Sequence, residues 1–323
     1  MPSNENPNPL VRVTDLFGAS KPLEQLVSAI ERGVGNLLRP IQKRRETKVD
    51  IASYEDWNEA LKRTGLEASR AELTLGERAT VRVTAEHART QRNREAVAVQ
   101  AISDYRNSVA NEGHDESGAG NAINAEWLDR FWRLSENVSD TQMQEVWGRV
   151  LSRKARGAAQ YSARCLEALS LLSRDEAIKL ERLSRFVMSA RSGGIQTHFF
   201  LLDPKQFPND RANELAKEIM KIVGALHRSI FGPAGLYVDS GSGWLQDVAV
   251  DVADGIADVS IARIPYVIRF PGNKDCISGI GSGLGITPLG AEIFSIIETQ
   301  PERAYVEKLS EALSIYGLHL TPV

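Results

Sequence analysis

Histidines and cysteines are the side chains best suited to bind metals or to activate a nucleophile, and this chain carries few of them. The five histidines are His87, His114, His198, His227 and His319, and the two cysteines are Cys165 and Cys276. No two histidines show the H-x-x-x-H spacing that places two imidazoles on one helix face, and none lies near a cysteine. The spacing predicts no metal site, and we interpret each histidine as structural or surface-exposed.

Two further patterns could serve a ligand. A glycine-rich run at residues 279–285 precedes a predicted helix, where a phosphate loop would lie, but Leu284 breaks G-x-G-x-x-G and no Gly-Lys-Ser/Thr follows. We interpret this run as a flexible loop. Four aspartates are spaced so that they would share one face of a helix. This spacing favours a solvated acidic face over a cation site, which usually needs carboxylates close together in a loop. The four aspartates are Asp247, Asp251, Asp254 and Asp258.

The sequence therefore assigns no catalytic residue, no cofactor and no metal, and a non-enzymatic role is the simpler interpretation. An enzyme whose site is assembled from residues distant in the sequence is the alternative. The one candidate interaction patch is basic, with five cations within ten residues: Arg39, Lys43, Arg44, Arg45 and Lys48. Such a patch suits phosphate or an anionic membrane surface, or it forms the solvated end of a packed helix.

The patch follows a predicted amphipathic helix that begins at Ser20-Lys21-Pro22. Its apolar stripe consists of Leu23, Leu26, Val27, Ile30, Val34, Leu37 and Leu38. The stripe packs on the core of the same chain, or a second chain or lipid covers it. Because region 50–112 is polar and has few apolar residues of its own, we expect a second chain, and therefore a homo-oligomer or a protein partner. Nucleic acid and peripheral membrane contact are the other partners considered.

The composition is that of an ordinary globular protein with more than one core. The chain has 323 residues, a net charge of −3 and 42% hydrophobic residues, so its surface as a whole is not built for nucleic acid. Two cysteines suit a reducing compartment, and no signal peptide and no apolar run of the ~18 residues that span a bilayer is present. We expect a cytoplasmic protein.

The domain organisation follows from shifts in pattern along the chain. We predict a disordered arm at 1–19, a helical arm with a role in oligomerisation at 20–112, and a linker at 113–123. A helical core at 124–190 and an α+β, winged-helix-like domain at 191–323 complete the chain. The predicted fold class is mainly α with a smaller α+β C-terminal part.

The core is the best-defined region. Apolar spacing predicts four successive helices between residues 127 and 190, and their aromatic side chains, Trp127, Phe131 and Trp132, should make this the best-anchored segment. Capping boxes are predicted at Ser139-Asp140-Thr141-Gln142 and at Ser173-Arg174-Asp175-Glu176, and Ser162 should cap the helix between them.

Beyond the core, Ser192-Gly193-Gly194 is predicted to end the last of these helices. Strands are predicted at 197–202, 235–238 and 259–268, and helices at 208–230, after Thr287-Pro288 and at 304–316, before a short terminal strand. Helices followed by strands and a returning helix suggest the winged-helix-like arrangement.

Four sequence segments of the predicted core are similar to a known family. The segments WLDRFW at 127–132, ENVSD at 136–140, MQEVWGRVL at 143–151 and SARCLEAL at 162–169 are similar to a bacterial family of unknown function related to the Abi-alpha abortive-infection proteins. The chain departs from that family at Ser152-Arg153-Lys154 and at Gly157-Ala158-Ala159. The resemblance implies a bacterial, phage-defence context and carries over no catalytic residue.

These observations lead to one main hypothesis and two alternatives. We expect a non-enzymatic, cytoplasmic interaction or regulatory protein that acts in bacterial phage defence. The first alternative is a nucleic-acid-binding, winged-helix-like module, and the second is a peripheral membrane-associated abortive-infection protein.

Overall fold

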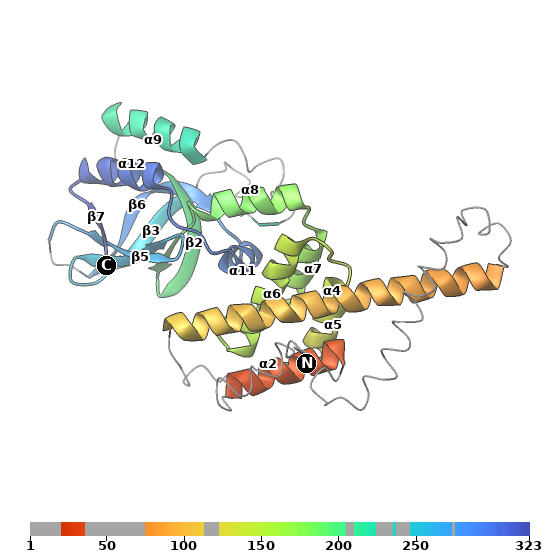
Figure 1. Cartoon of the computed structure of the whole chain (residues 1–323). Coiled ribbons are helices and arrows are strands. Elements are labelled where there is room, and N and C mark those ends of the chain that lie inside the picture. The colour runs from red at the N-terminus through yellow and green to blue at the C-terminus, as the bar shows by residue number, and fades with distance from the viewer. Residues whose placement is uncertain are drawn as a thin grey trace, which may run out of the picture. The chain divides into compact units, whose positions relative to one another are not determined.

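The chain folds into two compact units, Met1–Leu166 and Glu167–Val323. The computed structural model describes residues 21–35, 75–112, 123–204, 210–223, 235–236, 246–272 and 275–323 (Figure 1). The predicted arm at 1–19, the predicted linker apart from Ile123, and the basic patch lie outside these residues. The division at residue 166 falls inside the predicted core of 124–190, within the helix at Ala163–Leu171.

The first unit is helical in its described part. It contains α2 (Lys21–Val34), α4 (Leu75–Glu112), α5 (Ala125–Ser135), α6 (Thr141–Ala155) and the first residues of α7 (Ala163–Leu171). The long helix α4 packs along α6, and α2 packs against α4, α5 and α6 (Figure 1). Together with α8 (Arg174–Ser184), these elements include the four successive helices predicted between 127 and 190.

An aromatic cluster holds the first unit together, as predicted. The Phe131 ring lies 5.4 Å from Trp127, 5.1 Å from Trp132 and 5.3 Å from Trp147, measured between ring centroids. All four side chains are buried. The indole N–H of Trp127 donates to the Tyr161 carbonyl oxygen over 2.7 Å, so one polar atom of the cluster is satisfied inside the unit. The segment is therefore anchored by aromatic burial and by directed hydrogen bonds.

The apolar stripe of the first predicted helix is covered by its own chain. Leu23, Leu26 and Ile30 of α2 are buried, with at most 3% of each residue exposed. The neighbours that cover them are α4, α5 and α6. The same chain therefore covers these three residues, and a protein partner at the N-terminal helices stays a prediction. Leu37 and Leu38 lie outside the described residues.

Helix α4 is polar because several of its side chains form hydrogen bonds to the ends of neighbouring helices. Gln91 donates to the Val34 carbonyl oxygen over 3.0 Å, and Arg94 donates to the Gly33 carbonyl oxygen over 2.7 Å. Asn93 donates to the Glu136 carbonyl oxygen over 2.8 Å. The last carbonyl groups of a helix have no partner within the helix, so these bonds cap the C-termini of α2 and α5.

Of the predicted helix caps, two are confirmed and one is shifted. Ser173 and Glu176 form the reciprocal capping box of α8, and Ser162 accepts a hydrogen bond from the Cys165 backbone N–H at the start of α7. At α6 the N-cap is Asp140, not Ser139, and its carboxylate accepts from the Met143 N–H over 3.0 Å. A carboxylate at this position also stabilises the positive end of the helix dipole.

The second unit is built on a seven-stranded antiparallel sheet with the order β3-β6-β2-β1-β4-β5-β7. The strands are β1 (Met188–Ser192), β2 (Ile195–Asp203), β3 (Gln246–Val252), β4 (Ile256–Ile261), β5 (Ile264–Arg269), β6 (Cys276–Gly285) and β7 (His319–Pro322). Its helices are α8, α9 (Asp210–Val223), α11 (Pro288–Ile296) and α12 (Arg303–Ser314), with the end of α7. The mixed α and β content that we predicted is confirmed (Figure 1).

Two predicted elements had wrong boundaries, because each contains a two-residue hairpin turn that the prediction did not recognise. The helix expected to run to residue 190 ends at Ser184, and Met188–Ser192 form a strand that turns at Gly193 and Gly194, with φ of 60° and 76°. The single strand expected at 259–268 is a hairpin whose turn residues, Ala262 and Arg263, have φ of 48° and 70°. Two successive positive φ values match the right-handed twist of the flanking strands.

The glycine-rich run and the acidic spacing also belong to strands. Residues 279–285, interpreted as a flexible loop, lie in β6 between β2 and β3. A Cβ at Gly283 would lie 2.3 Å from the Phe200 carbonyl oxygen, so the run is glycine-rich because the sheet packs closely there. The four aspartates occupy β3, β4 and the turn between them, so the helical face considered for them does not exist.

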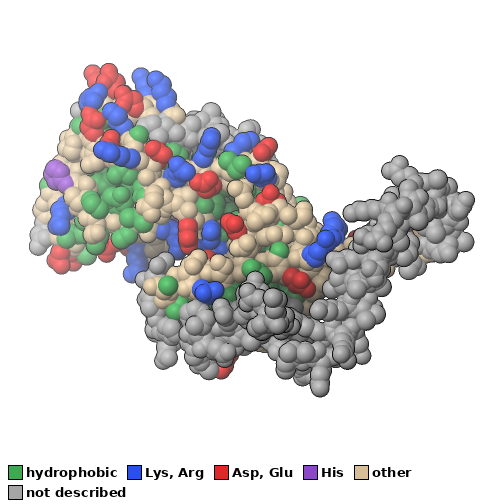
Figure 2. Space-filling model, in the orientation of Figure 1, with side chains coloured by type: hydrophobic (Ala, Val, Ile, Leu, Met, Phe, Trp, Pro, Cys, Tyr) green, Lys and Arg blue, Asp and Glu red, His purple; other side chains and the backbone are tan. Residues whose placement is uncertain are grey.

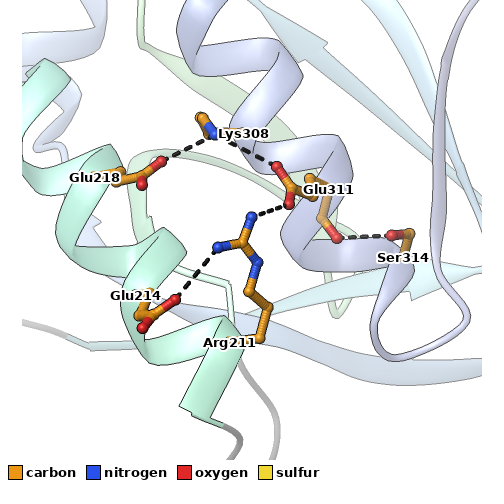
Figure 3. A network of polar contacts seen from close by, with 6 residues as sticks. All are labelled: Arg211, Glu214, Glu218, Lys308, Glu311 and Ser314. Carbon is orange, nitrogen blue, oxygen red and sulfur yellow. Dashed lines mark hydrogen bonds and ion pairs between the residues drawn. The ribbon is translucent and has the colours of Figure 1, made fainter.

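Helices α9 and α12 lie side by side and are joined by a network of charges (Figure 3). Arg211 of α9 donates to Glu214 of its own helix and to Glu311 of α12, while Lys308 of α12 lies 3.0 Å from Glu218 and 3.5 Å from Glu311. The hydrogen bond from Arg211 lowers the pKa of Glu311, and the bond to Glu218 raises the pKa of Lys308. All of these side chains are at least one-third exposed, so the network orients α9 more than it stabilises the unit.

Candidate functional site

The sequence-predicted candidates do not converge on one site in the described part of the chain. The basic patch, Arg39, Lys43, Arg44, Arg45 and Lys48, lies outside that part, as do His114 and His227. His87 and His319 are exposed. Among the described residues no three histidine, cysteine or acidic side chains are grouped as metal ligands would be, and no described helix is long and apolar enough to span a bilayer.

The structure instead shows an open cleft of about 780 Å³ in the second unit. Its walls are the end of α8, the β4–β5 turn and the segment between α11 and α12. The lining residues are Glu181, Arg185, Ala262, Arg263, Ile264, Glu298, Thr299, Gln300, Pro301, Glu302 and Arg303. Three arginines and three glutamates line this cleft, so its formal charge is zero.

Arg185 links two walls of the cleft. Its guanidinium lies 2.9 Å from the Glu181 carboxylate and 3.8 Å from that of Glu302, and its backbone oxygen accepts from the Glu302 N–H over 3.3 Å. The hydrogen bond to Glu181 raises the pKa of Arg185. The Nε atom of Arg185 is buried and has no hydrogen-bond acceptor among the described residues.

The other two arginines stand at different positions on the cleft. Arg263 projects from the β4–β5 turn and donates to the Ser295 carbonyl oxygen over 3.1 Å, which places a cation at the C-terminal end of α11. Arg303 pairs with Glu307 one helical turn along α12 and its side chain is 90% exposed. The cleft thus presents one mostly solvated guanidinium and one that is held against a helix end.

A smaller recess of about 150 Å³ adjoins the cleft and shares Ala262, Arg263 and Thr299 with it. Most of its walls are apolar, and α11 contributes Ala291 and Phe294. Its polar groups come in pairs. Ser189 Oγ lies 2.7 Å from His198 Nδ1, and Ser184 Oγ lies 2.9 Å from Thr299 Oγ1. Burial lowers the pKa of His198, so the imidazole is neutral at pH 7.

Local sequence explains how these groups meet. Ser189 and His198 are opposite each other in the β1–β2 register, and the two-residue turn at Gly193 and Gly194 sets that register. The β4–β5 turn is fixed by a hydrogen bond from the Ala262 N–H to the Val187 carbonyl oxygen over 2.8 Å. Left-handed backbone at two non-glycine residues costs about 1 kcal/mol or more each and tends to occur at binding sites.

Sequence reasoning missed this site, although one signal was present. His198 was assigned to a strand and interpreted as structural, and Ser189 was placed in a helix. Had Gly193-Gly194 been interpreted as a hairpin turn, the equal spacing of Ser189 and His198 on either side would have paired them. The segment between α11 and α12 carries no comparable signal, since its contribution to the cleft depends on how both helices pack.

The described residues therefore define a two-unit α and β protein with a polar, charge-balanced cleft in its second unit. Residues 77–219 match the model of a family described as "Protein of unknown function (DUF2806)". The match covers fewer than half of the residues and runs from α4 to α9, so it includes Ser189 and His198 but not the β4–β5 turn. No curated protein and no solved structure gave a significant match.

Proposed function

We propose that this chain is a non-enzymatic interaction protein whose C-terminal unit binds a peptide segment of mixed charge in the cleft. The observation that supports this proposal is the lining of the cleft by three arginines and three glutamates at zero net charge. A uniformly anionic ligand would meet Glu181, Glu298 and Glu302 as well as the arginines. A peptide that carries both acids and bases can match both sets of side chains.

Selection from a random dodecapeptide library tests the binding proposal. We expect the selected peptides to be enriched in both acidic and basic residues, and Arg185→Glu to lower their affinity at least tenfold. Arg182→Glu is the matched control, because Arg182 lies on the same helix, is exposed and does not line the cleft. A selection that yields no peptide able to distinguish Arg185→Glu from Arg182→Glu would reject the proposal.

Phage defence is the proposed biological setting, and the resemblance to the Abi-alpha-related family supports it. Deletion of the gene should increase plaque formation by some members of a broad phage panel. Reintroduction of the wild-type chain or of Arg182→Glu should restore resistance, whereas Arg185→Glu should not. Unchanged sensitivity of the deletion strain to every phage would remove the defence part and leave the peptide-binding part to its own test.

Nucleic-acid binding is the second candidate function. Its support is the winged-helix-like interpretation, which is based on helices followed by strands and a returning helix, an order that the described elements contain in α9, β3 to β6 and α11. The cleft argues for peptide instead, and Figure 2 shows acidic and basic side chains interspersed on the described surface that faces the viewer. Binding of mixed DNA or RNA that weakens steeply with salt would favour this candidate. Absence of any mobility shift at low salt would exclude it.

The proposed partner at the N-terminal helices must be tested on the full-length protein. Removal of residues 1–121 deletes α2 and α4, and α4 packs along α6, so the remainder would lose part of its core. Sedimentation of the full-length protein measures subunit number without that damage, and a single subunit would reject self-association. Flotation with anionic liposomes tests the peripheral-membrane alternative in the same sample.

A further inference from the structure

The recess beside the cleft has the dimensions of a single-ring ligand. Its volume is about 150 Å³, and an apolar cavity of ~150 Å³ in another protein binds benzene. Phe294, Val187 and Ile297 supply apolar walls, so a ring would exchange water for carbon contacts on several sides. The recess is therefore large enough for a phenyl ring and too small for a bicyclic ligand of the size of an indole with substituents.

The hydrogen-bonding capacity of the wall is defined by the Ser189–His198 pair. If the Ser189 hydroxyl donates to Nδ1, then Nε2 carries the proton and is a donor, while Ser189 Oγ keeps acceptor capacity. If Nδ1 carries the proton and donates to Ser189, then the hydroxyl proton is free to donate and Nε2 accepts. In both tautomers the pair retains one donor and one acceptor. A ligand hydroxyl can either donate or accept, so it can form a hydrogen bond to one atom of the pair in either arrangement.

Charge disfavours an ionised ligand in this recess. The imidazole of His198 is neutral at pH 7, because burial lowers its pKa. The nearest guanidinium, that of Arg263, donates to the Ser295 carbonyl oxygen and stabilises the end of α11. A carboxylate or an ammonium group placed among Val187, Ala291 and Phe294 would lose hydration without a dedicated counter-charge.

We propose that the recess is the anchor pocket for an uncharged phenol ring, the side chain of a tyrosine in a bound peptide. The ring lies against Phe294 and Ala291, and its hydroxyl bonds to the Ser189–His198 pair. The backbone on either side of that tyrosine continues into the charged cleft, which shares Ala262, Arg263 and Thr299 with the recess. The identity of the phenol as a peptide side chain depends on the function proposed above, whereas binding of a free phenol does not.

Four small probes that share one ring test the chemistry on the full-length protein. They are phenol, toluene, benzoate and benzylammonium, and the readout is the His198 imidazole proton resonance in NMR spectra, assigned by its absence from His198→Gln. Phenol should shift this resonance saturably with a Kd in the millimolar range. Toluene should bind about five- to tenfold more weakly, because one hydrogen bond is lost. Benzoate and benzylammonium should give no saturable shift.

Two variants locate the binding at the recess. Ala291→Leu fills the recess and should abolish the phenol shift. Ala304→Leu, at an exposed position of α12, is the matched control and should bind phenol as the wild type does. Ser189→Ala changes almost no volume and should reduce phenol affinity towards that of toluene. Thermal unfolding of each variant verifies that the second unit is folded.

Specific results would overturn the proposal. They are the absence of a saturable phenol shift in the wild type, an Ala291→Leu variant that is folded and retains phenol affinity, or benzoate binding as tightly as phenol. The two proposals fail separately. Peptide selection that returns mixed-charge peptides without a tyrosine would reject the tyrosine anchor alone. Phenol binding without any selected peptide would reject the peptide function, and with it the tyrosine, but not the phenol pocket.

Discussion

The indole Nε1 of Trp132 donates a hydrogen bond to the Ala29 carbonyl oxygen over 3.0 Å, and so joins α5 to α2 across 103 positions of the chain. The same ring lies over Gly33, one turn further along α2, where a Cβ would be 1.9 Å from Trp132 Cε2. The contact exists because residue 33 has no side chain. It is the direct evidence that α2 belongs to the core of the first unit.

Gly33→Ala should therefore destabilise the first unit by about 1–3 kcal/mol, because the indole must move and lose its bond to Ala29. Chemical denaturation followed by tryptophan fluorescence measures the change. Gly76→Ala is the control, since Gly76 lies in helix α4 and, among the described residues, no atom outside its own stretch of helix lies within 4 Å of the added Cβ. That variant should be neutral or slightly more stable, because alanine favours helix. Equal stability of the two variants would contradict the packing of α2 described above.

Gly148→Ala should have a similar or larger effect at the α4–α6 contact. The added Cβ would lie 2.6 Å from Gln100 Cβ and 2.7 Å from the Ala101 backbone nitrogen. A backbone atom cannot rotate away as a side chain can, so the two helices must separate, at a cost of about 2–3 kcal/mol. Hydrogen exchange should show faster exchange in α4 between Val97 and Tyr105, which are buried. Unchanged exchange there would indicate that the two helices do not depend on this close approach.

Asp251 should stabilise the β1–β2 turn that positions Ser189 and His198. Its two carboxylate oxygens accept from the Gly193 and Gly194 backbone N–H groups over 2.6 and 2.8 Å. Asp251→Ala should cost about 1 kcal/mol, since the bonds are exposed to solvent. Asp258→Ala is the control, because Asp258 is an exposed residue of β4 that does not contact the β1–β2 turn through a hydrogen bond among the described residues. Thermal unfolding distinguishes them, and an Asp258→Ala variant as unstable as Asp251→Ala would refute this assignment.

Acidification should loosen α9 from α12 before it unfolds the second unit. The pKa of Glu311 is lowered from its ordinary value of 4.5 by the hydrogen bond from Arg211. A lowered folded-state pKa means that its contribution is complete above pH 4.5 and is lost as the pH falls through the folded pKa. Hydrogen exchange in α9, compared between pH 6 and pH 3.5 after correction for intrinsic rates, should show lost protection. Glu311→Gln should remove this pH dependence, and its persistence in that variant would assign it to another group.

Protonation of His198 should also reduce the stability of the second unit as the pH falls, in a higher pH range than protonation of Glu311. Burial lowers its pKa below the ordinary value of 6.5, so the unfolded chain binds the proton first and stability falls as the pH drops below 6.5. His198→Gln should make stability less dependent on pH between 6.5 and 5. Urea midpoints across that interval provide the measurement, and an unchanged slope in the variant would show that His198 does not contribute.

The sequence by itself determined the elements whose signals are local. The capping box of α8, the Ser162 cap and the apolar spacing around Phe131 depend on residues within one or two helical turns, and the structure contains all three. The strand expected at 197–202 also formed, as part of β2. Tertiary structure decided the elements where local preference was ambiguous. The glycines of β6 favour a loop in isolation and form a strand because β2 and β3 supply hydrogen bonds on both sides.

The candidate site is a feature that only the tertiary structure decided. Nothing local brings Arg185, Ala262 and Thr299 together, because they lie on α8, a hairpin turn and the α11–α12 segment, and only sheet order and helix packing place them around one cleft. The same holds for α2, whose apolar stripe predicted burial but could not say whether its own chain or another would cover it. Hydrophobic burial is non-directional, so the sequence specifies that a face must be covered, and the tertiary structure decides by what.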